Sequence, residues 1–186
     1  MKKKPLDLLA IFPQINDIRD ESLRIAVTEV WDELWRRSKW LDINAMPTSV
    51  EVPAYPHIPH NQAVLTMALA AADTFESIHG VTVNRDHLIA GAVLQDASKV
   101  VETEPDPEAG IAQTETGKSL PHAFWAAHVA VQKGVPESIV HIILNHTPQS
   151  PRFPESLEGK ILYYVDQLDM VAIYKDRWRK ELMITK

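Results

Sequence analysis

The stretch that decides the fold is His87-Leu-Ile-Ala-Gly-Ala-Val-Leu-Gln-Asp-Ala-Ser-Lys99. Its apolar residues recur at helical spacing, which predicts a buried helix, and Asn84 is placed to cap its amino end. The stretch ends in an amide, a carboxylate and an amine, which are Gln95, Asp96 and Lys99. A carboxylate at the end of a buried helix is costly to desolvate unless it is paired. Asp96 is therefore expected to find partners elsewhere in the chain.

The candidate partners share one feature, because each lies on its own apolar segment. They are His60, His122, His146 and Asp166. Taken singly, each has an ordinary structural explanation, such as a helix cap, a surface residue or a buried salt bridge. Taken together, imidazoles and carboxylates from several helices form a ligand set suited to zinc, iron or manganese in a site without thiolates. Such a set fits a metal held in the middle of a helical bundle.

Composition predicts a globular protein, since 45% of the 186 residues are apolar. The net charge of -6 argues against a broad surface for nucleic acid or anionic membranes. No apolar run is long enough to span a membrane, and the basic start lacks the features of a signal peptide. The absence of cysteine excludes disulfides, thiolate zinc sites and a cysteine nucleophile, and is compatible with a cytoplasmic location.

The remaining segments predict further helices around the central one. A short helix or turn is expected over residues 5–13, and an amphipathic helix begins at Asp20 and carries Trp31 as a core residue. Four prolines predict an extended connection without a helix over 41–59, and composition and apolar period predict a helix that begins after His60 and ends at Gly80. Polar loops are expected over 102–119, followed by a helix over 122–133 with Pro121 at its first position. Two more helices are predicted, one opened by Pro136 and one beginning near Ser156.

The ordered set of His and Asp residues resembles the HD superfamily of metal-dependent hydrolases. That family has a His opening a helix, a His-Asp pair ending a buried helix, often further histidines, and a late Asp in an apolar helix. The chain matches in the order His60, Gln95-Asp96, His122, His146 and Asp166, and Lys99 matches the Lys that ends the family's Leu-Leu-His-Asp-Ile-Gly-Lys. The two intermediate histidines resemble the dinuclear subset of the family.

The resemblance covers roughly residues 55–175 and implies an all-α, HD-domain-like helical bundle. The chain is then a single helical domain over 1–186, with an N-terminal helical extension over 1–50 and an HD-like core over 55–175. The implied cofactor is a divalent metal (Fe, Mn or Zn). The implied metal ligands are His60, Asp96, His122, His146 and Asp166.

One position departs from the family pattern, because Gln95 stands where the family has His. Gln offers a carbonyl oxygen to a hard cation but is a weaker ligand than imidazole for zinc or iron. Three interpretations follow. The metal could be held by His60, Asp96 and Asp166, with Gln95 as a weak ligand or a hydrogen-bonding neighbour. It could instead lie towards Asp96 and the two later histidines, or the site could have lost its metal.

The expected function is a hydrolase in which a metal activates water to attack a small-molecule substrate, a phosphate ester or another anionic compound. Asp96 and Lys99 are the expected catalytic residues. Gln95, Lys99 and Arg152 are the expected substrate-binding residues.

Other functions stay open. Within the enzyme class, these are a dinuclear iron oxygenase, against which Gln95 counts, and a non-phosphate hydrolase or lyase. A non-catalytic binding or assembly protein is the other class, with a homo-oligomer formed through the Trp-rich N-terminal helix and residues 174–180.

Overall fold

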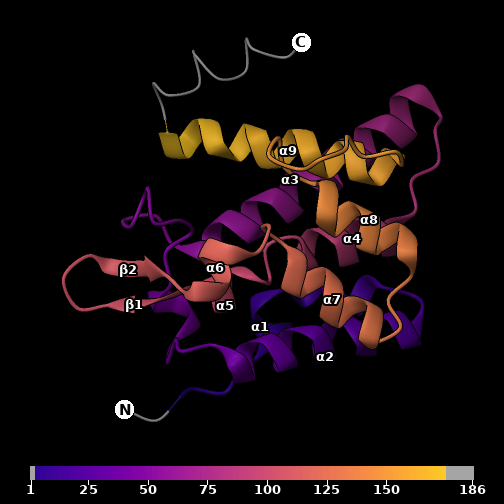
Figure 1. Cartoon of the computed structure of the whole chain (residues 1–186). Helices are drawn as coiled ribbons and strands as arrows, with labels where there is room; N and C mark the ends of the chain where they lie inside the picture. The colour runs from indigo at the N-terminus through magenta and orange to yellow at the C-terminus, as the bar shows by residue number, and fades with distance from the viewer. Residues whose placement is uncertain (1–2, 175–186) are drawn as a thin grey trace.

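The computed structural model describes residues 3–174 and is a bundle of helices with one small β-hairpin at its side (Figure 1). The prediction of an all-α helical bundle is confirmed. The longer helices are α2 (Glu21–Arg37), α3 (His57–His79), α4 (Arg85–Leu94), α7 (Phe124–Gln132), α8 (Glu137–Asn145) and α9 (Leu157–Tyr174). The short ones are α1 (Leu8–Ile11), α5 (Lys99–Glu102), α6 (Glu115–Ser119) and two 3₁₀ helices, η1 (Pro13–Asp17) and η2 (Ile43–Ala45).

Helix α4 is the centre of the bundle and packs against α2, α3, α8 and α9. The side chain of Asn84 accepts the His87 backbone N–H at 3.2 Å, so the predicted cap is present. Gly91 permits the close approach of two neighbouring helices, because a Cβ there would lie 2.9 Å from Leu162 on α9 and 3.0 Å from Ile142 on α8. The carboxyl end of α4, which carries the predicted site, is thereby held deep in the bundle.

Helix α2 lies across the bottom of the bundle in the view of Figure 1 and packs against α4 and α7. Asp20 caps it by accepting the N–H groups of Ser22 and Leu23, at 2.9 and 3.1 Å. Trp31 is fully buried and its indole N–H donates to the Val93 carbonyl at 2.9 Å, which ties α2 to α4. The core role predicted for Trp31 is thus confirmed. The division into an extension and an HD-like core stays a prediction.

The proline-rich connection differs from the prediction at both ends. A single turn of 3₁₀ helix, η2, occurs within it, and α3 begins at His57 instead of after His60. Pro59 therefore lies in the first turn of α3. A proline is tolerated there because the first N–H groups of a helix have no partner within the helix. The earlier start places His57 and His60 on the same buried end of α3, at 0% and 1% exposure.

The segment predicted as polar loop contains regular structure. Strands β1 (Thr103–Asp106) and β2 (Gly110–Gln113) pair antiparallel, with Thr103 opposite Gln113. The Asp106 side chain accepts the N–H groups of Glu108 and Ala109, and this closes the turn that composition predicted as loop. Short helix α6 follows the hairpin and packs on α5.

The start of α7 also differs from the prediction. Pro121 is not its first residue, because the helix begins at Phe124 and His122 stands outside it. Ala123 adopts a left-handed backbone conformation, with φ of 65°, that is uncommon outside glycine. Its N–H donates to a Glu102 carboxylate oxygen at 3.1 Å, which holds this turn in place. As a result, His122 is turned towards the carboxyl end of α4.

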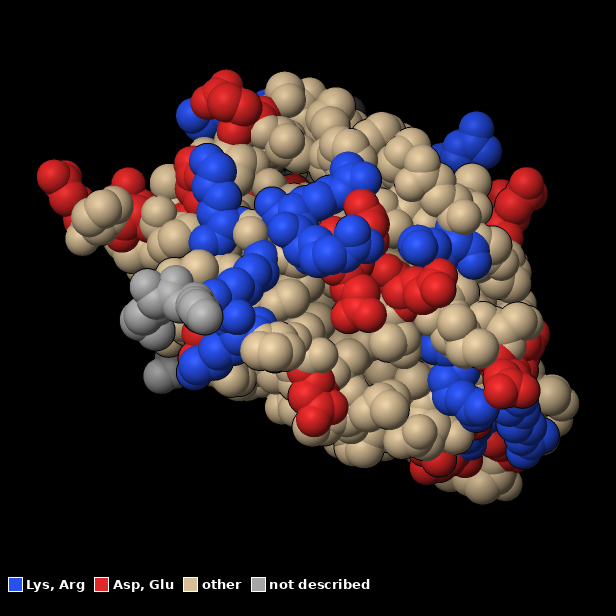
Figure 2. All heavy atoms as spheres, turned by 90° about the horizontal axis from the view of Figure 1, so that it is seen from below, with Lys and Arg blue, Asp and Glu red and all other residues tan. Residues whose placement is uncertain are grey.

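The surface beneath α2 carries charges of both signs. Basic side chains gather on this face, with acidic ones beside and between them (Figure 2). Arg36 and Arg37 both pair with Glu33, and Lys133 pairs with Glu29 at 3.3 Å. None of the helices in the described range has the length and apolar character needed to cross a membrane. The proposed self-association segment 174–180 lies at and beyond the end of the described residues.

Candidate metal centre

Asp96 is the centre of the candidate site, and the turn between α4 and α5 positions it. Gln95 still has helical backbone angles, and its N–H bonds to the Gly91 carbonyl at 2.9 Å. The chain then turns, and the Lys99 N–H bonds back to the Asp96 carbonyl at 3.1 Å as α5 begins. The Asp96 side chain is 1% exposed. A charge at this depth requires close partners of opposite charge or good donors.

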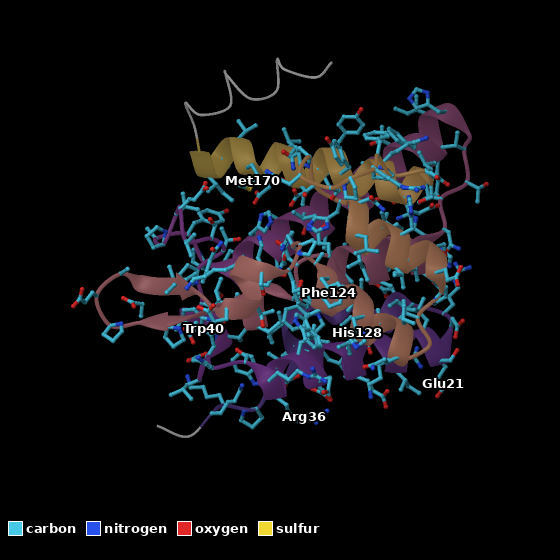
Figure 3. All side chains as sticks on the ribbon, in the orientation of Figure 1. Glu21, Arg36, Trp40, Phe124, His128 and Met170 are labelled. Atoms are coloured by element: carbon cyan, nitrogen blue, oxygen red, sulfur yellow. The ribbon has the colours of Figure 1, made fainter. Side chains whose placement is uncertain are left out.

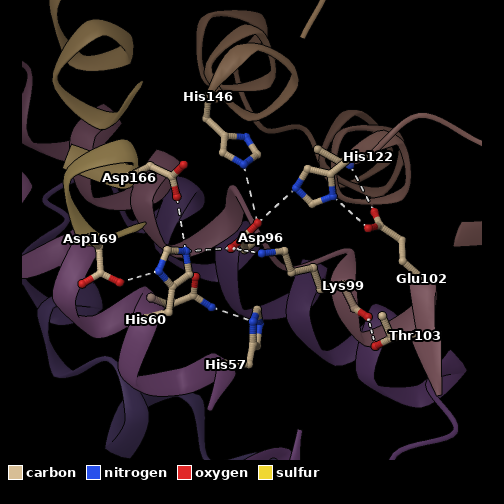
Figure 4. Close-up of polar contacts among 12 residues, drawn as sticks. His57, His60, Asp96, Lys99, Glu102, Thr103, His122, His146, Asp166 and Asp169 are labelled. Atoms are coloured by element: carbon tan, nitrogen blue, oxygen red, sulfur yellow. Dashed lines mark hydrogen bonds and ion pairs between the residues drawn. The ribbon is translucent and has the colours of Figure 1, made fainter. Parts of the chain in front are cut away.

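The two carboxylate oxygens of Asp96 face different partners (Figure 4). Oδ1 lies 3.1 Å from His122 Nε2 and 3.5 Å from His146 Nε2. Oδ2 lies 3.2 Å from His60 Nε2 and 2.8 Å from Lys99 Nζ. Asp166 Oδ1, from α9, also lies 3.2 Å from His60 Nε2. The five segments predicted to contribute to one site therefore meet around a single carboxylate.

Each histidine presents Nε2 to this carboxylate because its Nδ1 has another partner. His60 Nδ1 lies 2.7 Å from Asp169 Oδ2, and His122 Nδ1 lies 2.8 Å from Glu102 Oε2. His146 Nδ1 donates to the Ile143 carbonyl at 2.7 Å, since a carbonyl can only accept. These contacts set the orientation of all three rings, as the outer partners of metal-binding histidines do.

The electrostatics of the site follow from these contacts. Burial alone would raise the pKa of Asp96, but the Lys99 ammonium and the three imidazoles hold it well below its usual range. Burial would lower the pKa of His122, yet the bonds to Asp96 and Glu102 raise it to about 9. Burial opposes protonation of His60 as well, and its carboxylate neighbours raise its pKa well above the usual value. Protons on these two rings balance the carboxylates when no cation is bound.

The residues present fit a divalent metal. Two groups of three offer ligand atoms that all lie within 4.8 Å of one another. We call the group of Asp96, His122 and His146 the imidazole-rich group, and that of His60, Asp96 and Asp166 the carboxylate-rich group. Nε2 of His146 is buried and has no hydrogen-bond partner among the described residues. Because buried polar atoms are nearly always satisfied, an unpaired imidazole nitrogen facing a carboxylate is the signature expected of a metal ligand.

Gln95, a predicted substrate-binding residue, is buried without a hydrogen-bond partner in the described part of the chain. Its side chain is 0% exposed, and neither amide atom has a hydrogen-bond partner within residues 3–174. His57 is equally buried, with Nε2 3.0 Å from the Asn61 amide nitrogen and Nδ1 unpartnered. Burial lowers the pKa of His57 to about 3, so this ring is neutral. No local sequence pattern distinguished His57 as a buried polar residue.

A cavity of about 670 Å³ opens onto the site. Its floor carries Lys99 and the residues of both ligand groups, namely His60, Asp96, His122, His146 and Asp166. Its walls come from four parts of the chain: the loop after α2, the hairpin, the loop that follows α8, and helix α9. Helix α9 contributes Tyr163 and Met170, the second of which is labelled in Figure 3. A cavity of this volume is of the size that small-molecule ligands occupy.

Arg152, a predicted substrate-binding residue, and His128 of α7 lie apart from the cluster. Arg152 is exposed in the loop after α8 and is not among the described residues that line the cavity. His128 is exposed on α7 and stacks on Phe124, with ring centroids 5.9 Å apart (Figure 3). The substrate-binding role predicted for Arg152 therefore has no support from its position.

Two functional neighbours escaped the sequence analysis. Asp169 follows Asp166 by three residues, a spacing that puts both carboxylates on one face of α9. That spacing was a usable signal. Glu102 lies in an acidic, proline-containing stretch that predicted only a solvated loop, and no local pattern distinguished it from its acidic neighbours.

Comparison with known families and proteins yields matches over the region that carries these residues. The family model described as HD domain matches residues 59–171. The dihydroneopterin 2',3'-cyclic phosphate phosphodiesterase of Methanocaldococcus jannaschii is 34% identical over 113 residues, which are 60% of this chain and 45% of that protein. No solved structure matches the chain significantly.

Two 3'-5' exoribonucleases called YhaM are also similar. The protein from a Geobacillus species is 30% identical over 130 residues, covering 63% of this chain and 38% of its own length. The Bacillus velezensis protein is 32% identical over 130 residues, covering 63% of this chain and 39% of its own. The chain thus spans less than half the length of each relative that it matches.

Proposed function

Because this chain belongs to the HD domain family, we propose that it is a metal-dependent phosphohydrolase that acts on a small phosphate ester. The observation that carries the proposal is the buried Asp96 carboxylate, which three imidazoles and one ammonium face on the floor of a cavity. This arrangement joins a ligand set for a divalent cation to a fixed positive charge for an anionic substrate.

The proposed ligands are the members of the two groups, with Asp96 shared between them. A divalent cation, when bound, lowers the pKa of a water molecule and polarises the substrate oxygen. The chain contributes orientation, because the Nδ1 partners of the histidines already point each Nε2 at the shared carboxylate. Preorganised ligands need little rearrangement when the cation enters.

Lys99 is the proposed anchor for the phosphate group. Its ammonium lies 2.8 Å from Asp96 Oδ2 and lines the cavity, with 20% of the side chain exposed. Burial would lower the pKa of Lys99, but the Asp96 carboxylate raises it, so the side chain stays charged at neutral pH. An ammonium held beside the ligands can stabilise the charge that develops on a phosphoryl oxygen during hydrolysis.

The proposed substrate is a small phosphodiester. Support comes from the cavity volume of about 670 Å³ and from two kinds of relative, one named a cyclic phosphate phosphodiesterase and the other an exoribonuclease. The net charge of -6 argues against a broad basic surface of the kind that binds long nucleic acids. We therefore favour a cyclic or short diester over a polymer.

The experiment that tests this function measures hydrolysis after chelation and reloading with Mn²⁺, Fe²⁺ or Zn²⁺. Substrates are 4-nitrophenyl phosphate, bis(4-nitrophenyl) phosphate, a 2′,3′-cyclic nucleotide and a short oligoribonucleotide. We expect the diesters to be cleaved with one of these metals and the Asp96→Ala variant to be inactive. Lys99→Met should lose roughly 10²–10³-fold in kcat/KM, as removal of one transition-state donor does.

The matched control is Asp73→Ala, which removes a carboxylate from the surface of α3, where the side chain is 70% exposed. It should retain wild-type activity. Full activity in Asp96→Ala, or failure of the metal-loaded wild type to cleave any of the phosphate esters, would refute the proposal. In the second case a binding protein or an oxygenase becomes the better interpretation. A cytoplasmic location and self-association stay proposals, which cell fractionation and size-exclusion chromatography test.

A further inference from the structure

The two oxygens of the Asp96 carboxylate lie in unequal surroundings. Oδ1 faces two imidazoles, with His122 Nε2 at 3.1 Å and His146 Nε2 at 3.5 Å. Oδ2 faces His60 and also the ammonium of Lys99, at 2.8 Å. A cation approaching Oδ2 must therefore share that oxygen with the Lys99 ammonium, which stays charged, whereas both rings that face Oδ1 can bind the cation themselves once they are neutral.

The imidazole-rich group is the better prepared for a borderline metal. Its two rings lie with centroids 5.2 Å apart, and each has its Nδ1 fixed by a partner on the protein. His146 Nε2 is buried and makes no hydrogen bond among the described residues, and its recorded neighbour is Asp96 Oδ1 at 3.5 Å. Within this group only the contact of His122 Nε2 with Asp96, at 3.1 Å, has to give way to the cation. Two imidazoles and one carboxylate suit Zn²⁺, Fe²⁺ or Co²⁺ better than a set with one imidazole.

The carboxylate-rich group is weaker for such ions for three reasons. It has a single imidazole, because the residue before Asp96 is Gln95. Nε2 of His60 is already shared between Asp96 and Asp166, at 3.2 Å from each. The oxygen-rich ligands of the carboxylate-rich group favour a harder cation such as Mn²⁺. The ammonium of Lys99 also reduces the net negative charge that would attract any cation to this group.

From these contacts we propose that the first borderline divalent cation binds the imidazole-rich group, Asp96–His122–His146. The carboxylate-rich group binds a second cation more weakly and selects a harder one. Asp169 does not reverse this order, because its carboxylate is engaged by His60 Nδ1 at 2.7 Å and acts on the metal only through that ring. The inference deepens the proposed function and rests on its metal dependence.

The test measures metal binding to the chelated wild-type chain and does not depend on turnover. Zn²⁺ is titrated by calorimetry, and X-ray absorption at one equivalent counts the imidazoles around the zinc. We expect a tight first equivalent with two imidazoles and a weaker second event. One imidazole at the first equivalent would overturn the inference.

Two variants remove one ligand from each group. His146→Ala should weaken the first equivalent by more than about 100-fold, the upper end of the effect seen for outer partners of metal ligands. Asp166→Asn should leave the first equivalent within about 3-fold of wild type and abolish the second. The opposite pattern would overturn the assignment. In that pattern the first equivalent is lost in Asp166→Asn and kept in His146→Ala. If one variant is poorly folded, the affinity of the other for the first equivalent still decides between the two groups.

A gain of binding provides an independent arm. Gln95→His should tighten the second equivalent by at least about 10-fold, because an imidazole replaces an amide beside the carboxylate-rich group. The matched control is Gln132→His, which adds a histidine to the exposed end of α7 and should change neither event. Equal second affinities in the two variants would contradict the role given to Gln95.

The outcomes separate this inference from the proposed function. A chain that binds zinc as described but cleaves no phosphate ester supports the order of metal binding and refutes the phosphohydrolase. A chain that cleaves phosphodiesters with its first zinc on one imidazole supports the function and refutes the order.

Discussion

Glu102→Gln is the substitution that most directly tests how the site is organised. In the wild type, Glu102 Oε2 accepts from His122 Nδ1 at 2.8 Å, and Oε1 accepts the Ala123 N–H at 3.1 Å. Glutamine keeps the size of the side chain and can keep the bond to Ala123. Its amide nitrogen then faces His122 Nδ1 and can only donate to it.

The preferred tautomer of neutral His122, which is the form that binds a metal, should change as a consequence. A donor at Nδ1 favours the form that carries its proton on Nε2, which is the atom that faces Asp96 and would bind a metal. A metal can bind Nε2 only after this proton has left it, and the free energy of that step weakens metal binding. Loss of an outer partner of this kind costs about 10–100-fold in metal affinity, or about 1.4–2.8 kcal/mol.

The assay is competition between the metal-free variant and a chelating dye for the first equivalent of Zn²⁺. Glu104→Gln is the matched control, because Glu104 lies on strand β1 of the hairpin, pairs with Lys39 from the loop after α2 and has no recorded contact with His122. Circular dichroism verifies that both variants are folded. If Glu102→Gln binds the first zinc within about 3-fold of the control, the argument that Glu102 sets the tautomer is wrong.

Three further predictions follow from individual contacts. Asp169→Asn should weaken the second metal equivalent by about 10–100-fold through His60 and leave the first unchanged, and loss of the first equivalent in the same titration would contradict this. The metal-free protein should lose up to about 3 kcal/mol of stability as pH rises from 6.5 through about 9, because protonated His122 stabilises the folded state only below its raised pKa. Thermal melts at several pH values should show this loss in the wild type and not in His122→Gln. Parallel stability curves for the two proteins would refute it. Gly117→Ala should destabilise the chain by about 1–3 kcal/mol in urea melts, because the added methyl group would collide with the Glu102 backbone carbonyl, and wild-type stability would show that α6 can move away.

The helices of the bundle were predictable because their signals are local. Apolar residues at helical spacing identified α2 and the buried α4, and the caps Asp20 and Asn84 occur where side-chain chemistry requires them. Gly80 ends α3 with a positive φ of 65°, as a glycine after a helix does. These features depend on residues within a few positions of one another.

Errors occurred where a contact from another part of the chain competed with local preference. The hairpin over β1 and β2 has an acidic, proline-containing composition typical of a loop, and strand pairing with α5 and α6 packed beside it decides its structure. Likewise Pro121 is an ordinary first residue for a helix, but Glu102 holds Ala123 in a left-handed turn and delays the start of α7.

The sequence by itself determined the bundle, its buried central helix and the order of the histidines and carboxylates along the chain. Only the tertiary structure decided which atom of each meets which partner. His60 and Asp169 are 109 residues apart, and nothing in either local segment predicts that Nδ1 of one lies 2.7 Å from the other's carboxylate. The physical reason is that helix formation depends on neighbours three and four positions away, whereas ligand orientation depends on where the packing of α3, α4 and α9 places separate helix ends.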